Sequence, residues 1–370
     1  MIGWASRRRG ALVTLAALLT GACAIPLGGA PEGGVVTPPV QPQGWHFLTR
    51  DHVSLWYHGL SLVLPPADTM ALPIYDPEEQ QRALEAARRA NADPTPIEAI
   101  AARMRAEFAG SSAYHQLQFV PLYFDDAASL FTAIRLWQEA QGDPQRAGSQ
   151  RGAEAVALLS TMFQTERQRR SIIEFAAALE QESRAYYGAY WRTRAEELRP
   201  LAEAAHTEWA MLQDSLQPLF RYLEVQSGEA LLTPALGPEG RTVTTRTFVR
   251  TAVGTPRIGS TGRAAGSEVA FSVLHELMYS LVGEAIAEHV SPARVREFGE
   301  QVLQTRAAVR AGAMVLERRA PHRVAEYRAY YLRMARRTGT GDTAFRNAYA
   351  LPLELVSGLN QFIDQALAGI

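Results

Sequence analysis

The sequence predicts a mostly α-helical α+β fold over residues 45–370, organised as a single domain. Three observations lead to this prediction. Apolar residues recur at helical spacing through most of the chain from Asp76 onward, convincing strand patterns are confined to residues 229–253, and a long apolar helical pattern follows them directly. A chain of 370 residues is long enough to bury a large core. We therefore expect a small β-hairpin that precedes a long, largely buried helix.

The N-terminus has the features of an export signal. Arg7–Arg9 are basic, and Gly10–Leu19 form an apolar segment too short for a stable membrane anchor. The following residues, Leu-Thr-Gly-Ala-Cys, resemble a bacterial lipobox, and they hold the only cysteine of the chain. We predict that residues 1–22 are a lipoprotein signal peptide and that Cys23 is lipidated. Cleavage nearby by an ordinary signal peptidase is the alternative.

Residues 23–44 form a Pro/Gly-rich segment with almost no charge. This composition cannot bury a core and behaves as a flexible tether. The sequence thus predicts an exported protein of the cell envelope, held on the membrane through its N-terminal lipid, on the periplasmic side if the cell is Gram-negative. The formal net charge of −1 gives no electrostatic reason to expect a nucleic acid partner.

The folded part opens with a short apolar stretch, Trp45–Thr49, that suits a strand, followed by a helical pattern over Asp51–Leu64. His52 and His58 lie on this helix. Because side chains six residues apart do not share a helix face, we interpret them as parts of an aromatic, packed helix and not as a joint metal site.

Several further helices are predicted before the strands. A proline at the first helical position marks two of the starts. The predicted segments are residues 76–92, 95–109 and 125–141, then three more up to about residue 225. Their aromatic residues are expected in the core.

Two strands are predicted at Glu229–Ala235 and Arg241–Val253, the second rich in β-branched residues. The five residues between them, Leu236–Gly240, contain Gly and Pro and suit a turn. We expect the two strands to form a β-hairpin.

The next pattern, Ser267–Glu288, predicts one amphipathic helix with Ser267 as its N-cap. Within it, His275 and Glu276 stand in an otherwise uncharged turn. Its apolar residues recur at a spacing of three and four: Phe271, Leu274, Met278, Leu281, Val282 and Ile286.

The stretch His-Glu-Leu-Met-Tyr resembles the H-E-x-x-H signature of zincin metallopeptidases, with Tyr279 in place of the second His. The order of elements also resembles that of uncharacterised bacterial metallopeptidase-like proteins. The resemblance implies that His275 is a zinc ligand, Glu276 the general base, and Tyr279 a weak phenolate ligand or an oxyanion donor. The implied Zn²⁺ site is incomplete. The alternative is a His-Glu pair on the polar edge of a core helix.

In gluzincins a Glu from a later helix completes the site, so the resemblance implies a third ligand downstream. Glu326 lies 51 residues after His275, at the start of a predicted helix, and is favoured over Glu354, which lies in a more apolar run.

From these observations we expect an exported, membrane-tethered zinc metallopeptidase-like protein with a degenerate motif, weakly active or a pseudo-enzyme. A peptide or protein ligand would bind along a strand edge. The alternative is a non-catalytic helical lipoprotein that binds a peptide or another envelope component.

Overall fold

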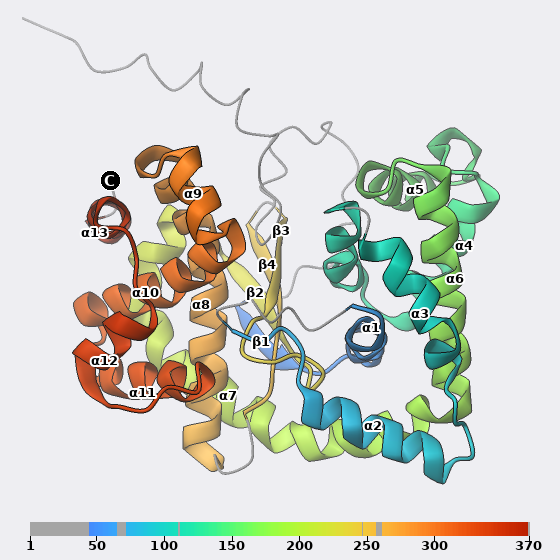
Figure 1. Cartoon of the computed structure of the whole chain (residues 1–370), viewed down its shortest axis with the longest axis horizontal. Helices are drawn as coiled ribbons and strands as arrows, with labels where there is room; N and C mark the ends of the chain where they lie inside the picture. Colours follow the sequence, from blue (N-terminus) through green and yellow to red (C-terminus); the bar gives the residue numbers. More distant parts are fainter. Residues whose placement is uncertain (1–43, 65–71, 110–111, 246, 257–260, 369–370) are drawn as a thin grey trace, which may run out of the picture.

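The computed structural model describes residues 44–64, 72–109, 112–245, 247–256 and 261–368. Cys23 and the predicted signal peptide and tether lie outside these residues, apart from Gly44. Helices account for 74% of the structure and strands for 7%, which confirms the predicted mostly helical α+β class. The strands form one small sheet that lies between two groups of helices (Figure 1).

The helices and strands follow the predicted order closely. In the first half of the chain the elements are β1 (Trp45–Leu48), α1 (Asp51–Val63), α2 (Pro77–Arg89), α3 (Pro96–Ala109), α4 (Ala127–Glu139), α5 (Gln150–Met162), α6 (Glu166–Glu182) and α7 (Gly188–Tyr222). Short 3-10 turns, η1 (Ser112–Gln118), η2 (Val120–Tyr123) and η3 (Pro144–Arg146), join some of these helices, and one turn of π-helix, η4 (Ser183–Tyr187), connects α6 to α7.

The second half of the chain contains the remaining strands and the C-terminal helices. These are β2 (Ser227–Leu232), β3 (Arg241–Thr245), β4 (Phe248–Val253), α8 (Gly262–His289), α9 (Pro292–Phe298), α10 (Glu300–Arg319), η5 (Pro321–Arg323), α11 (Val324–Met334), α12 (Gly341–Ala348) and α13 (Leu353–Ala368).

The predicted pairing of the strands is wrong. The strand order is β1-β2-β4-β3, with β1, β2 and β4 parallel and β3 antiparallel to β4. The stretch predicted as one strand, residues 241–253, reverses direction between Thr245 and Phe248 and forms the hairpin by itself. All six residues of β2 are buried, as expected of a strand covered on both faces.

The sheet separates the hydrophobic core into two clusters. Successive residues of β2 point to opposite faces, so that Ala230 and Leu232 join one cluster and Leu231 joins the other. Helices α1–α6 supply most of one cluster and α8–α13 most of the other, on the two sides of the sheet in Figure 1. Helix α7 contributes to both, with Leu198 in the first cluster and Ala202 in the second.

Helix α8 is the central helix of the second cluster. It is longer than predicted, because Thr261 is its N-cap and Ser267 lies inside it. It is also the one helix of the described residues that is long and apolar enough to cross a membrane, but 83% of its most apolar 18-residue window is buried inside the protein. That burial is typical of a core helix.

Candidate functional site

Helix α8 carries the predicted motif in its most buried part. Every side chain from Ala265 to Tyr279 is buried, and the helix packs against α7, α10 and α13. His275 is 0% and Glu276 2% exposed, so neither lies on a polar edge of the helix. Since a charged group is costly to bury alone, both side chains require polar partners inside the protein.

The main partner is Glu239, which the sequence analysis did not identify. It lies in the loop between β2 and β3 and is fully buried. His275 Nε2 is 3.3 Å from its Oε2, and the hydroxyl of Tyr279 donates to its Oε1. Thr305 of α10 donates to the same Oε1 over 3.1 Å. Three side chains from two helices therefore converge on one carboxylate.

The carboxylate of Glu276 is held by the hairpin. Its Oε1 accepts a hydrogen bond of 2.9 Å from the backbone N–H of Gly240, and its Oε2 lies 3.1 Å from the hydroxyl of Thr242. Gly240 is needed for this contact, because a Cβ there would lie 2.5 Å from the carbonyl oxygen of Ala252 and 2.8 Å from Cδ of Glu276. The hairpin backbone thus approaches α8 closely.

Arg241 adds a buried positive charge. It is 2% exposed and donates to the side-chain oxygen of Gln118 and to the carbonyl of Gly240. One guanidinium nitrogen lies 3.9 Å from Oε1 of Glu239. A cation therefore already stands beside the carboxylates.

These contacts separate the acidities of the two glutamates. Burial acts to raise the pKa of Glu239, but the hydrogen bond from His275 and the nearby charge of Arg241 bring it below its ordinary value. Burial raises the pKa of Glu276 to about 7, and the charge of Glu239 acts in the same direction. Near neutral pH, Glu239 is ionised and Glu276 is partly protonated.

The imidazole of His275 has one nitrogen without a partner. Nε2 faces the carboxylate of Glu239, and the ring packs at 5.1 Å from Tyr279 and 5.5 Å from Tyr331 between centroids. Nδ1 is buried and accepts or donates no hydrogen bond within the described part of the chain. The tautomer with its proton on Nε2 satisfies Glu239 and leaves only an acceptor unpaired.

Glu239, His275 and Glu276 form a group that could hold a metal ion. One ligand atom from each lies within 4.8 Å of the other two. Nε2 of His275 is 3.3 Å from an oxygen of Glu239 and 3.8 Å from one of Glu276, close to the separation of roughly 3.4 Å between tetrahedral ligands at about 2.1 Å from a metal. One imidazole and two carboxylates suit a divalent transition metal.

The structure brings together His275, Glu276 and Tyr279 but does not place either candidate third ligand with them. The side chain of Glu326 is 56% exposed and forms an ion pair of 2.9 Å with Arg323. That of Glu354 is 45% exposed and lies 3.8 Å from Arg294. Glu326 lies away from His275 because of the orientation of α11, which turns its tyrosines toward the core and this carboxylate toward solvent.

The later helix that reaches the site is α10, which supplies Thr305 and not an acidic side chain. One weak signal for Glu239 was present in the sequence, because it is the single charged residue in the Leu-Gly-Pro-Glu-Gly turn. Nothing in the local sequence marks Thr305. His52 and His58 take no part: His52 Nε2 contacts the carbonyls of Pro121 and Phe124, and His58 pairs with Glu182.

Comparisons of the chain with protein-family models, with curated proteins and with solved structures found no match. The resemblance to zincins therefore remains a prediction that rests on His275, Glu276 and the order of the surrounding elements.

Proposed function

We propose that this protein is an exported, membrane-tethered zincin-like protein whose site is weakly active or inactive as a peptidase. The observation that carries the proposal is the convergence of His275, Tyr279 and Thr305 on the carboxylate of Glu239. In the zincin arrangement, the first two of these positions and one on a later helix would hold the metal. Here the carboxylate of Glu239 takes the place of the ion as their common partner.

The charges of the cluster support this proposal. Glu239 and Arg241 balance one another, and Glu276, with its pKa raised to about 7, is half neutral at neutral pH. The net charge is therefore between 0 and −1. A divalent cation would bring this buried group to a net charge between +1 and +2, beside a guanidinium 3.9 Å from Glu239. Such an uncompensated buried charge is costly.

Access to the site argues in the same direction. Peptide hydrolysis by a zincin needs water and substrate beside the general base. Glu276 is 2% exposed, and each of its oxygens already has a partner in the hairpin, Gly240 for one and Thr242 for the other. Each oxygen keeps one further acceptor site, but the burial of the side chain leaves little access for water or substrate to reach it. We infer that the remaining role of the protein is to bind a peptide or another component of the envelope.

Metal binding is the second candidate, favoured by the close spacing of Glu239, His275 and Glu276. In that case Nε2 of His275 and a carboxylate oxygen of Glu239 would be ligands, and a bound zinc ion would act as a Lewis acid. Tyr279 and Thr305 would then give up their hydrogen bonds to Glu239, or share the carboxylate with the metal.

The metal content of the full-length chain, purified in detergent without chelators, tests the proposal. We expect much less than one zinc per chain, both as purified and after incubation with excess zinc and desalting. A His275→Ala variant and a His46→Ala variant serve as a matched pair, because His46 is an exposed imidazole on β1.

Near-stoichiometric zinc that is lost in His275→Ala and kept in His46→Ala would overturn the metal-free proposal. A peptidase assay on the same samples, with Glu276→Gln as the control, would then decide whether the site is active.

A further inference from the structure

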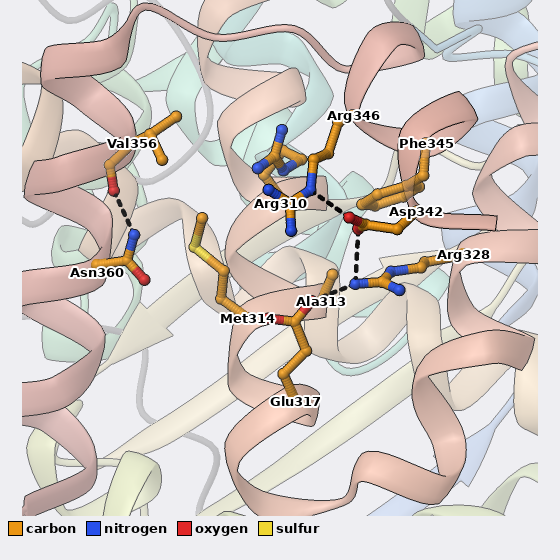
Figure 2. Close-up of a pocket in the computed structure, with 10 residues that line it drawn as sticks. All are labelled: Arg310, Ala313, Met314, Glu317, Arg328, Asp342, Phe345, Arg346, Val356 and Asn360. Atoms are coloured by element: carbon orange, nitrogen blue, oxygen red, sulfur yellow. Dashed lines mark hydrogen bonds and ion pairs between the residues drawn. The ribbon is translucent and has the colours of Figure 1, made fainter.

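A second polar site lies among the C-terminal helices, away from the His-Glu motif. A cavity of about 100 Å³ is enclosed by α10, α11, α12 and α13 (Figure 2). Three arginines line it, Arg310, Arg328 and Arg346, together with two carboxylates, Glu317 and Asp342. Counting these side chains alone, the lining carries a net charge of +1.

Two of the arginines, Arg328 and Arg346, form ion pairs with the two carboxylates. Asp342 accepts from Arg346 over 2.6 Å through one oxygen and lies 2.9 Å from Arg328 through the other. Arg328 also pairs with Glu317. Figure 2 shows Asp342 between these two arginines, with dashed lines to both, and Arg310 beside them without one. The lining therefore has one cation in excess.

That cation is Arg310. It is only 8% exposed, and no hydrogen bond or ion pair joins it to another residue in the described part of the chain. Burial lowers the pKa of Arg310 and the charge of Arg346 lowers it further, while the charges of Asp342 and Glu317 act in the opposite direction without cancelling the shift. The guanidinium nitrogens of Arg310 keep some solvent contact and line the cavity, so the acceptors for their N–H groups must be supplied by water or by an ion held there. An anion in the cavity would supply these acceptors together with a compensating negative charge.

We propose that this cavity binds a small oxyanion with the chemistry of phosphate, either the free ion or the phosphoryl group of a larger molecule. Arginine presents a planar fork of donors that matches such an anion, and it is the residue that most often binds one. The cavity has room for several waters or for one group of this size, and Phe345 is part of its lining.

The proposal does not depend on the proposed function. Arg310 follows Thr305 by five residues on α10, which places the two side chains about 140° apart around the helix axis. The oxyanion site and the Glu239 cluster therefore lie on different faces of α10, and a failure of one proposal leaves the other standing.

Phosphate binding to the full-length chain, purified in detergent in a phosphate-free buffer, tests this inference. Calorimetric titration and the rise in melting temperature with phosphate are measured at constant ionic strength, with chloride and nitrate as control anions. We expect saturable binding of phosphate. Arg310→Met should weaken it by about tenfold or more, because a charged hydrogen-bonding partner is removed.

The matched control is Arg319→Met, on the same helix. Arg319 is exposed and donates to the carbonyl of Ser215, and it does not line the cavity. We expect this variant to bind phosphate as the unchanged protein does. Without phosphate, Arg310→Met should unfold at the same temperature as the unchanged protein or a higher one, because it removes an unpaired buried charge.

A second variant, expected to tighten phosphate binding, keeps the proposal testable if Arg310→Met does not fold. Asp342→Asn removes a competing carboxylate and should tighten phosphate binding. No saturable binding, equal binding by Arg310→Met, or no tighter binding by Asp342→Asn would each overturn the proposal. Glycerol 3-phosphate separates the two sources: binding comparable to that of phosphate indicates the phosphoryl group of a larger molecule, and binding of phosphate alone indicates the free ion.

Discussion

The buried carboxyl of Glu276 should make the stability of the protein depend on pH in a defined window. Its pKa is about 7 in the folded protein and near 4.5 when the chain is unfolded. The folded state therefore holds this proton more tightly than the unfolded state. It follows that the contribution to stability is fully present below about pH 4.5 and is lost as the pH rises toward 7.

The size of the effect follows from the same two values. A pKa that rises from 4.5 to about 7 corresponds to roughly 3 kcal/mol of unfolding free energy. Most of this should disappear between pH 5 and pH 7.5. The pKa of Glu239 is lowered, so the stabilisation from its ionised form is fully present above the ordinary pKa of a glutamate and is lost as the pH falls below it. The two glutamates therefore act in separate pH ranges.

Urea denaturation followed by circular dichroism, at half-unit intervals from pH 5 to pH 8, measures this dependence. Glu276→Gln is the control, because the amide imitates the protonated carboxyl. Its oxygen still accepts from Gly240, and its NH₂ group can donate to the hydroxyl of Thr242. Glu284 and Glu300 also have raised pKa values, but both variants share them, so the difference between the two curves isolates Glu276.

We expect the unchanged protein to lose roughly 2–3 kcal/mol more than Glu276→Gln over this range. Parallel curves for the two proteins, or a relative gain of the unchanged protein with rising pH, would refute the placement of a carboxyl of raised pKa at this position.

Three further predictions concern the same site. Glu239→Ala removes the carboxylate that pairs with buried Arg241 and accepts from His275, Tyr279 and Thr305, and it should lower the unfolding free energy in urea by about 3–5 kcal/mol. Glu326→Ala, at an exposed ion pair, should change it by less than about 1 kcal/mol, and equal effects of the two variants would contradict the importance of Glu239. Gly240→Ala forces a methyl group against Glu276 of α8 and the backbone of β4, so it should lower the melting temperature and reduce the unfolding free energy by about 1–3 kcal/mol or more. An unchanged melting temperature would contradict the close approach of the hairpin backbone to α8. The combination Glu239→Ala, Tyr279→His and Thr305→Glu removes the competing carboxylate and adds two zinc ligands to His275, which makes three. It should bind close to one zinc per chain by elemental analysis, and a protein that folds but takes up no zinc would count against the zincin-like geometry.

The structure confirms those predictions that depend on neighbouring residues. Helix α3 begins at Pro96, as predicted, and α2 begins at Pro77 after the cap Asp76. These boundaries follow from proline at the first turn and from local capping. The β-branched residues of 241–253 likewise identified this stretch as extended. They did not identify that it divides into β3 and β4, or that β2 pairs in parallel with β4.

Strand pairing and the third polar partner depend on contacts between distant parts of the chain. The predicted hairpin failed because β2 is buried on both faces and pairs with β4, which lies beyond β3 in the sequence. The third ligand was expected at Glu326 because its distance along the sequence was suitable. The rotation of α11 instead turns that carboxylate to solvent.

The sequence by itself determined that His275, Glu276 and Tyr279 lie on one buried helix, since helical periodicity and apolar flanks are local properties. Only the tertiary structure decided that Glu239 and Thr305, 36 residues before and 30 residues after His275, meet it at one point. The physical reason is that a buried carboxylate must find donors wherever the packing places them. Which donors it finds depends on how α8, α10 and the hairpin dock together, and no periodicity in the chain records that.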